Sequence, residues 1–284
     1  MSATDPGPLS LPRDRAAALG REAVAICAAG RYQPADGPEV GIADDVADAI
    51  AGTVSYAPNA ALPRPRARHP VSRTWAEPTS TLTAARALAG TGRRVAALNF
   101  ASATNPGGGF LTGARAQEES LCRSSALWPC LDGSPMYAHH RRRGGGMYDA
   151  WVIYSPDVPV FRGDDGALLA APFRIDFLTS PAVNAGVVRK HDPDAGPAIR
   201  RAMTERVARV LDVAAAHEVD ALVLGAWGCG VFGNDPDEIA ALFAAGLAER
   251  PGVFAEVAFA ILDTRPGTPL LRPFIERFGA RDRA

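Results

Sequence analysis

Three successive glycines, Gly107 to Gly109, stand shortly before two adjacent acids, Glu118 and Glu119. Glycine lets the backbone approach a ligand closely and adopt a positive φ, which can turn amide N–H groups toward an anion. Adjacent acids in the first turn of a helix point about 100° apart, so one could bind a hydroxyl while the other transfers a proton. Taken alone, the glycines could form a flexible turn, and the acids could compensate the helix dipole. Together they predict an anion-binding site with acid–base chemistry.

Two predicted strands lead into glycine-rich loops. The apolar run Val95–Ala101 is typical of a buried strand, and a helix is expected near Gln117–Ser125. A second strand, Ala221–Gly225, precedes the glycines of residues 228–233 and a helix at Pro236–Leu247. In an open α/β sheet, a loop between a strand and a helix lies at the carboxyl edge, where ligands bind.

The rest of the chain alternates in the same way. Further helices are expected at 12–29, near 44–51, at 82–89, from Ile199 to Ala214 and at 270–278, and further strands at 150–154, 173–179 and 254–262. This alternation predicts a parallel or mixed sheet with helices on both faces. We expect a disordered N-terminus at residues 1–11 and one domain at 12–284, whose first part, about 12–80, is an N-terminal extension.

The composition limits the class of protein. The chain has 284 residues, 47% of them hydrophobic, and a net charge of -1, which is unlike a polycation that holds nucleic acid. Its four cysteines show no close spacing, as expected of free thiols in a reducing compartment. No apolar stretch approaches a membrane span. We expect a cytoplasmic protein with no membrane contact, no sequence-specific nucleic acid partner, and neither a metal nor a cofactor.

The segment Asn99–Leu127 (NFASATNPGGGFLTGARAQEESLCRSSAL) resembles the signature of poly(ADP-ribose) glycohydrolases, and most of all their compact bacterial version. Two later segments, Thr179–Gly186 and Leu224–Asn234, agree with it, so that the resemblance covers roughly residues 90–265. It implies a three-layer α/β/α macrodomain-like fold with a mixed central sheet and an N-terminal helical extension. It also implies hydrolysis of ribose–ribose O-glycosidic bonds from polymer ends, with poly(ADP-ribose) or ADP-ribosylated proteins as substrate and ADP-ribose as product.

The same resemblance assigns roles to residues. Glu119 would be catalytic, protonating the leaving oxygen and then acting as base toward water, while Glu118 would bind ribose hydroxyls and orient the substrate. Asn105 would contact the distal ribose. The two glycine loops would line the diphosphate, and Val231 and Phe232 would pack on the terminal ribose. The substrate-binding set is Asn105, Gly107, Gly108, Gly109, Gln117, Gly228, Gly230, Val231, Phe232 and Gly233.

Other functions remain open at this stage. A macrodomain that binds ADP-ribose without cleaving it would have no use for Glu119, and a hydrolase could instead remove terminal ADP-ribose from proteins. The loop 228–233 also fits the dinucleotide motif G-x-G-x-x-G, although too little chain follows it for a nucleotide domain. A Walker A site is excluded, because no glycine-rich loop carries Lys-Ser or Lys-Thr.

The remaining unusual residues have plainer interpretations. The basic segment His139–Gly144 is predicted to be a flexible loop, either a solvated surface or a site that attracts a polyanion. Cys229 is expected to be a packing residue rather than a nucleophile, because no histidine lies near it in sequence. His191 is expected at the surface or at a helix cap. The tryptophans at 128, 151 and 227 are expected in the core or the wall of the cleft.

Overall fold

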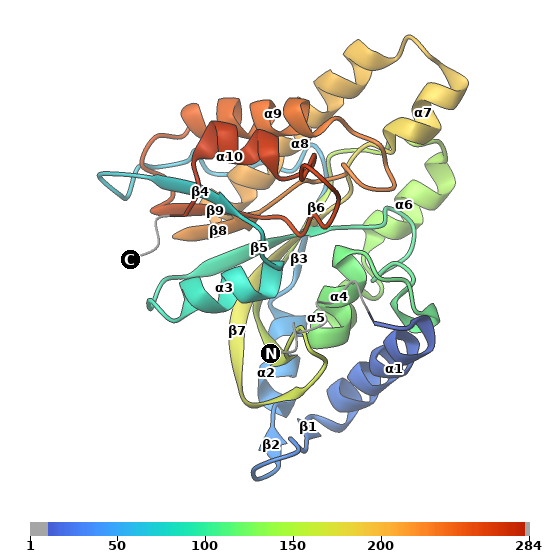
Figure 1. The fold of residues 1–284 in the computed structure, drawn as a ribbon, viewed down its shortest axis with the longest axis vertical. Coiled ribbons are helices and arrows are strands. Elements are labelled where there is room, and N and C mark those ends of the chain that lie inside the picture. The colour runs from blue at the N-terminus through green and yellow to red at the C-terminus, as the bar shows by residue number, and fades with distance from the viewer. Residues whose placement is uncertain (1–10, 282–284) are drawn as a thin grey trace.

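The computed structural model describes residues 11–281 (Figure 1). The predicted disordered segment therefore lies outside the described residues, except for Leu11. The described strands are β1 Arg31–Tyr32, β2 Val40–Gly41, β3 Val54–Tyr56, β4 Arg73–Glu77, β5 Val95–Phe100, β6 Val152–Arg162, β7 Leu168–Ser180, β8 Ala221–Leu224 and β9 Glu256–Ala260. The described helices are α1 Arg13–Ala29, α2 Ala43–Ala51, α3 Thr81–Ala89, the 3-10 turn η1 Phe110–Thr112, α4 Gln117–Ser124, α5 Leu127–Leu131, α6 Pro135–Arg143, α7 Ala185–His191, α8 Gly196–Ala216, α9 Pro236–Ala248 and α10 Arg272–Phe278.

Seven strands form one mixed sheet in the order β3-β6-β7-β5-β8-β9-β4. The strands β7, β5, β8, β9 and β4 pair in parallel, whereas β6 pairs antiparallel with both β3 and β7. Figure 1 shows α8, α9 and α10 on one face of the sheet and α1 to α5 on the other. The mixed α/β fold with helices on both faces is thereby confirmed.

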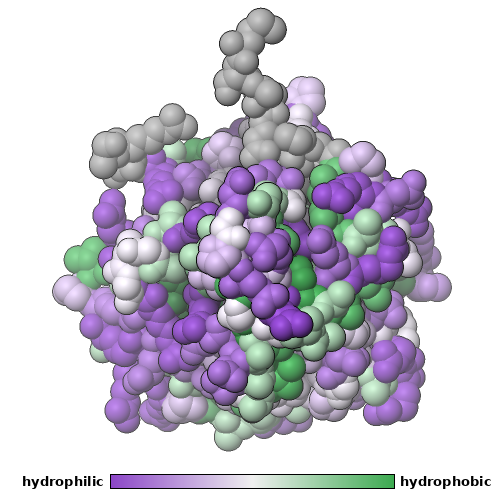
Figure 2. All heavy atoms as spheres, turned by 90° about the horizontal axis from the view of Figure 1, so that it is seen from below, coloured by the Kyte–Doolittle hydropathy of each residue, from purple (hydrophilic) through white to green (hydrophobic). Residues whose placement is uncertain are grey.

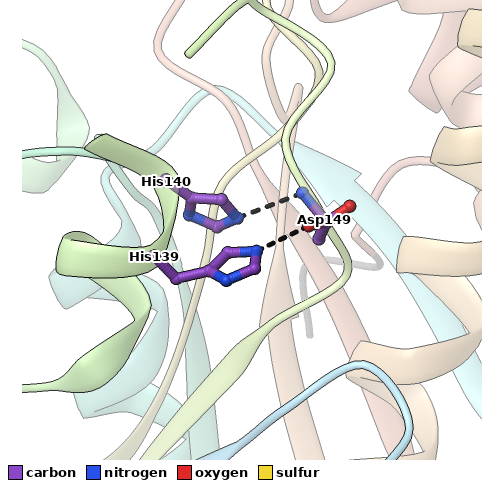
Figure 3. Close-up of side chains that lie close together, drawn as sticks. All are labelled: His139, His140 and Asp149. Carbon is purple, nitrogen blue, oxygen red and sulfur yellow. Dashed lines mark hydrogen bonds and ion pairs between the residues drawn. The ribbon is translucent and has the colours of Figure 1, made fainter. Parts of the chain in front are cut away.

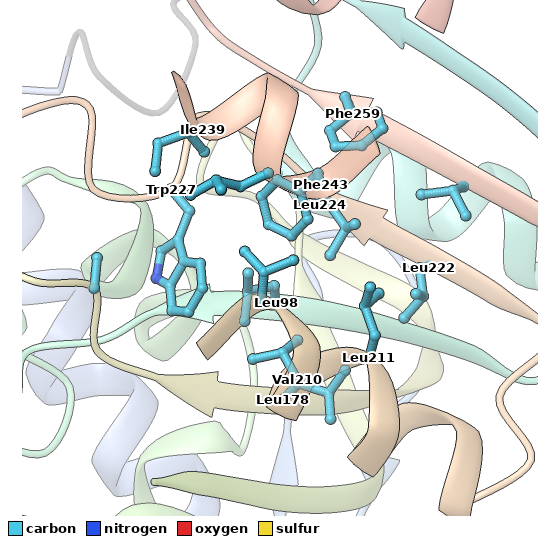
Figure 4. Packing of buried hydrophobic residues seen from close by; sticks show 14 of the residues in the cluster. Leu98, Leu178, Val210, Leu211, Leu222, Leu224, Trp227, Ile239, Phe243 and Phe259 are labelled. Atoms are coloured by element: carbon cyan, nitrogen blue, oxygen red, sulfur yellow. The ribbon is translucent and has the colours of Figure 1, made fainter. Parts of the chain in front are cut away.

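The two faces of the sheet bury separate apolar clusters. On the α8–α9 side, Trp227 and Phe243 pack with ring centroids 6.2 Å apart, and side chains of β5, β7 and β8 lie beside them (Figure 4). The indole N–H of Trp227 donates to the Ser180 carbonyl at 3.2 Å, so this buried polar atom has a partner. The loop that follows β8 is thus anchored in the core at its first turn.

The N-terminal helix α1 packs directly on the segment that carries the three glycines. A Cβ atom on Gly20 of α1 would lie 2.6 Å from the carbonyl oxygen of Phe110, so only glycine fits this contact. The buried Arg162 of β6 forms an ion pair of 2.7 Å with Glu22 and donates to the carbonyl of Arg123, the last turn of α4. Because an unpaired buried charge is costly, this arginine ties α1 to α4.

The structure corrects one local prediction. The basic segment from His139 to Arg143 is the end of α6, not a flexible loop, and His140 is fully buried. The hydroxyl of Ser134 caps the helix by accepting from the N–H of Met136, and Pro135 occupies its first turn. The basic residues stabilise the last turn through the helix dipole. They stop at Gly144, which has a positive φ of 64°.

The strands β6 and β7 are longer than predicted. The sequence indicates strands at 150–154 and 173–179, whereas the two strands extend to Arg162 and begin at Leu168. Irregular register between Ser155 and Val158 lets the strand continue past Pro156, which cannot donate to a ladder. The extra length projects toward α1.

The surface on the side of α1 and the β1–β2 hairpin is mainly hydrophilic, with hydrophobic residues in scattered patches (Figure 2). Within the described range, no helix is both long and apolar enough to cross a bilayer.

Candidate active site

A cavity of about 280 Å³ lies at the carboxyl edge of the parallel strands. Residues that follow β4, β5, β7, β8 and β9 all contribute to its wall, as expected for ligand sites of open α/β sheets. Its apolar part includes Leu82, Phe100, Trp227, Ile261 and Leu262, and its polar part includes Thr81, Gln117 and Asp164. The acid pair and the three glycines are not part of this wall.

The carboxyl group of Glu118 is buried under the loop that leaves β5. Its Oε2 accepts the backbone N–H of Ser102 at 2.7 Å, and its Oε1 faces Nδ2 of Asn99 at 3.4 Å. Burial, helped by the charge of the nearby Glu119, raises the pKa of Glu118 to about 8, although these hydrogen bonds act to lower it. Burial and the neighbouring acid both disfavour a negative charge on Glu118, so the two adjacent carboxyl groups are not readily charged at the same time.

Glu119 is held by the last of the three glycines. The N–H of Gly109 donates to Oε1 of Glu119 at 3.0 Å, while Oε2 is buried with no hydrogen-bond partner in the described part of the chain. Gly108 lies against both acids, because a Cβ atom there would be 2.3 Å from Oε1 of Glu119 and 3.0 Å from Oε2 of Glu118. Glu119 thus has one fixed oxygen and one unused oxygen.

The amide groups of the three glycines face inward. Gly109 donates to Glu119, Gly107 faces Glu118, and Gly108 donates to the carbonyl of Asn105 at 3.0 Å. The sequence predicts that such N–H groups meet an anion. In the structure these N–H groups instead face the two acids and the Asn105 carbonyl of the same loop.

Gln117 is engaged with the scaffold. Its Oε1 accepts from the N–H of Phe100 at 2.9 Å, and its Nε2 donates to the carbonyl of Leu98 at 2.7 Å and to the Thr81 hydroxyl at 3.1 Å. These bonds fix the start of α4 against the end of β5. Although Gln117 lines the cavity, its amide is already satisfied, which indicates that it positions the two acids that follow it.

The second glycine loop, residues 228–233, is closed by Asn234. Nδ2 of Asn234 donates to the carbonyls of Val183 at 2.7 Å and Gly228 at 3.1 Å. Gly228 has a φ of 75°, and a Cβ atom there would lie 2.6 Å from both Ala182 and Asn234. Val231 at the tip is 93% exposed. The loop is therefore rigid at its base and open at its tip.

Asn105 and Phe232 lie at the rim. Asn105 is exposed, and its N–H donates to the Ser102 hydroxyl at 3.1 Å. Phe232 is half-buried, and its ring centroid is 6.4 Å from that of Tyr148. The N–H groups of Gly230, Val231 and Phe232 donate no hydrogen bond to the described residues, which leaves three donors on this loop.

Several site residues escaped sequence reasoning. Asn99 and Asn234 hold the acid pair and the second loop, and a polar residue within an apolar strand or after a glycine loop is the signal that marks them. The cavity residues Thr81, Asp164 and Ile261 come from three distant segments, and no local pattern connects them. Burial raises the pKa of Cys229 to about 12, consistent with its predicted packing role.

The fold and the site define a class of protein: an α/β/α macrodomain-like enzyme with an acid pair beside a largely apolar cavity of about 280 Å³. The model of the microbial-type PARG catalytic domain matches residues 20–163. No curated protein matches the chain. The chain belongs to the microbial-type PARG catalytic-domain family, which confirms the family and the enzyme class predicted from its sequence.

Solved structures agree with this membership. The poly(ADP-ribose) glycohydrolase of Thermomonospora curvata is similar at 45% identity, with a TM-score of 0.87, over 94% of this chain and 100% of that chain. The enzyme of Deinococcus radiodurans in complex with ADP-ribose is similar at 44% identity, with a TM-score of 0.78, over 82% of this chain and 96% of that chain. The Thermomonospora enzyme was also solved with the inhibitor ADP-HPD.

Proposed function

We propose that this protein hydrolyses the ribose–ribose O-glycosidic bonds of poly(ADP-ribose) and releases ADP-ribose, with Glu119 as general acid and base. The unused, buried Oε2 of Glu119 is the observation that carries the assignment. A ribose alkoxide is a poor leaving group and needs a proton in the transition state. A carboxyl oxygen without a protein partner is free to deliver that proton.

The reaction balances with Glu119 alone as the proton carrier. Glu119 gives its proton to the leaving ribose oxygen as the glycosidic bond breaks and the anomeric carbon becomes oxocarbenium-like. The carboxylate then takes a proton from the attacking water, which restores the acid. The neighbouring Glu118 orients the substrate through a ribose hydroxyl and takes no part in the proton transfer.

The substrate extends from the cavity to the glycine loops. The apolar cavity, with Phe100 and Ile261 in its wall, suits an adenine base. The free N–H groups at the tip of the loop 228–233 suit the diphosphate, with Val231 and Phe232 against the terminal ribose. Asn105 at the rim then contacts the distal ribose next to Glu119.

The position of α1 supports cleavage from polymer ends. Arg13 donates to the carbonyl of Thr112 at 3.0 Å, and Arg115 donates to that of Leu11 at 2.9 Å, so the N-terminal extension closes one side of the glycine segment. A polymer that continued past this side would meet protein. We also infer a cytoplasmic location, which the four free cysteines support.

The test is incubation of the purified protein with poly(ADP-ribose), followed by chromatography of the products. We expect free ADP-ribose from the first time points, without a rise of oligomers, and loss of turnover in Glu119→Gln. The glutamine still accepts from Gly109 but carries no transferable proton, so ADP-ribose binding should persist. Release of ADP-ribose by both proteins, or by neither, would reject the proposal.

A further inference from the structure

The last turn of α6 and the segment after it form a side-chain cluster beside the site. His139, His140 and Asp149 point toward one another (Figure 3). Nε2 of His139 lies 2.7 Å from Oδ2 of Asp149, and the backbone N–H of Asp149 donates to Nε2 of His140 at 3.1 Å. Arg143 pairs with the other carboxylate oxygen at 3.4 Å. This cluster fastens residues 144–149 to α6.

The same three residues have the spacing of a metal site, since their ligand atoms lie within 4.8 Å of one another. However, the Nε2 lone pair of His140 already accepts the N–H of Asp149. Arg143 neutralises the carboxylate, and the buried guanidinium of Arg206 lies near enough to interact with it. A cation at this place would have to break these hydrogen bonds, and it would lie beside the positive charges of Arg143 and Arg206. The three residues are therefore better suited to bonding with one another than to binding a metal.

On one side, the cluster reaches the loop of Asn105. The buried His140 presents Nδ1 to the carbonyl of Ala103 without a well-formed hydrogen bond. Burial lowers the pKa of His140 to about 4, so the ring stays neutral. Its neighbour Arg141 donates to the carbonyl of Thr104 at 2.6 Å. The last turn of α6 therefore contacts the backbone directly before Asn105.

On the other side, residues 144–149 reach the second glycine loop. The carbonyl of Gly146 accepts the N–H of Asn184 at 2.8 Å, and that of Phe232 accepts the N–H of Gly186 at 2.9 Å. Tyr148 has a positive φ of 53°, a strained conformation for a bulky residue. Its ring lies between those of His140, at 5.4 Å, and Phe232, at 6.4 Å. The segment thus places an aromatic ring against the second loop.

We propose that Asp149 is a positioning residue: by pairing with His139 and His140 it holds residues 144–149 in place and aligns the Asn105 loop with the Phe232 loop. The distal ribose and the diphosphate of one substrate molecule can then contact the Asn105 loop and the Phe232 loop at the same time. This inference rests on the function proposed for those two loops. Asp149 touches no substrate and acts through Tyr148 and α6.

The test is Asp149→Asn, which keeps the backbone N–H to His140 but loses the negative charge that pairs with His139 and Arg143. The Kd for ADP-ribose and the KM for the polymer should rise about threefold to tenfold, the usual range for such coupling, while kcat changes less. Hydrogen exchange should become faster at residues 102–105 and at 228–233 but not in the core strands. The control Asp36→Asn, on the exposed β1–β2 loop, should match the wild type.

A pair of His139 variants separates positioning from general destabilisation. His139→Gln keeps an amide donor for Asp149 and should leave Kd close to the wild-type value, whereas His139→Ala removes the donor and should raise Kd as Asp149→Asn does. Unchanged Kd in Asp149→Asn, or faster exchange in only one of the loops, would overturn the proposal. So would stoichiometric Zn²⁺ binding by the wild type that Asp149→Asn abolishes. A wild type that neither turns over polymer nor binds ADP-ribose would defeat the proposed function instead, and the exchange measurement would still decide the role of Asp149.

Discussion

The backbone N–H of Gly109 donates to Oε1 of Glu119 at 3.0 Å and so fixes the carboxylate that lies ten residues further along the chain. The other oxygen, Oε2, stays buried without a partner in residues 11–281. One glycine amide therefore sets the direction of the side chain on which the proposed proton transfer depends. Of the three glycine amides, that of Gly109 contacts the proposed catalytic group, while those of Gly107 and Gly108 face Glu118 and the Asn105 carbonyl.

Replacing Gly108 by alanine should reduce activity far more than stability. The new methyl group would overlap Oε1 of Glu119 at 2.3 Å and would also occupy a backbone with a φ of 59°. We expect kcat to fall about 100-fold or more, since displacing a catalytic group by about 1 Å has that effect. Gly92→Ala is the control, because Gly92 has a φ of 76° but no atom near its Cβ position. Equal kcat values for the two variants would contradict the steric account.

Glu118→Gln should stabilise the protein at alkaline pH. Burial raises the pKa of Glu118 from 4.5 to about 8, so the folded protein binds a proton that the unfolded chain has released. Stability from this group is complete below about pH 4.5 and is lost as the pH rises toward 8. The Tm of the variant should exceed that of the wild type by at least about 2 °C at pH 8, the shift that 1 kcal/mol gives in a domain of this size. At pH 4.5 the gap should close, and a gap independent of pH would refute the assignment.

Replacing Arg141, Arg142 and Arg143 by glutamine should weaken binding of long polymer mainly at low salt. All three are exposed on the last turn of α6, beside the loop of Asn105. Each phosphate contact that is lost should reduce the slope of log K against log salt by about 0.7. The change of KM for long polymer between two salt concentrations measures this effect, because loss of the Arg141 and Arg143 contacts to Thr104 and Asp149 raises KM at both concentrations. The control is the double variant Arg272→Gln, Arg277→Gln on α10. If the α6 variant and this control have the same salt slope, the arginines of α6 do not bind the polymer.

Gly20→Ala should destabilise the protein although alanine favours helices. Alanine in a helix gains up to about 1 kcal/mol over glycine, but its Cβ atom would lie 2.6 Å from the Phe110 carbonyl. Overpacking of this kind costs about 1–3 kcal/mol, so the clash should outweigh the propensity and lower the Tm by several degrees. Gly196→Ala at the start of α8, where nothing lies near the Cβ position, should be neutral or stabilising. A higher Tm for Gly20→Ala would show that α1 can move away from the glycine segment.

The centre of the fold could be predicted because its signals are local. The apolar run of β5 and the helical spacing from Ile199 to Ala214 both appear in the structure close to their predicted bounds. The error at His139–Gly144 came from a basic, glycine-flanked composition, which concealed a capped helix whose fourth-last residue, His140, packs inside. The composition of a segment indicates how exposed its residues are on average. Whether the segment forms a helix depends instead on whether one of its faces is buried, as the face with His140 is here.

The chemistry of the site was predictable to a lesser extent. Positions in the motif identify Glu118 and Glu119, but not that burial sets the pKa of Glu118 near neutrality. Gln117 belongs to the same motif, yet its hydrogen bonds to β5 and α3 appear only in three dimensions. The pairing of Asp149 with α6 likewise depends on a turn whose shape no short pattern specifies.

The exposed tip of the second glycine loop has a thermodynamic consequence. Val231 is 93% exposed at the tip of a loop whose base is held by Asn234. If the terminal ribose covers it, association removes apolar surface from solvent, and the heat capacity of binding becomes negative. Calorimetry of ADP-ribose binding over a range of temperatures would measure the contribution of this loop to the heat-capacity change. Val231→Ser should make that change smaller in magnitude.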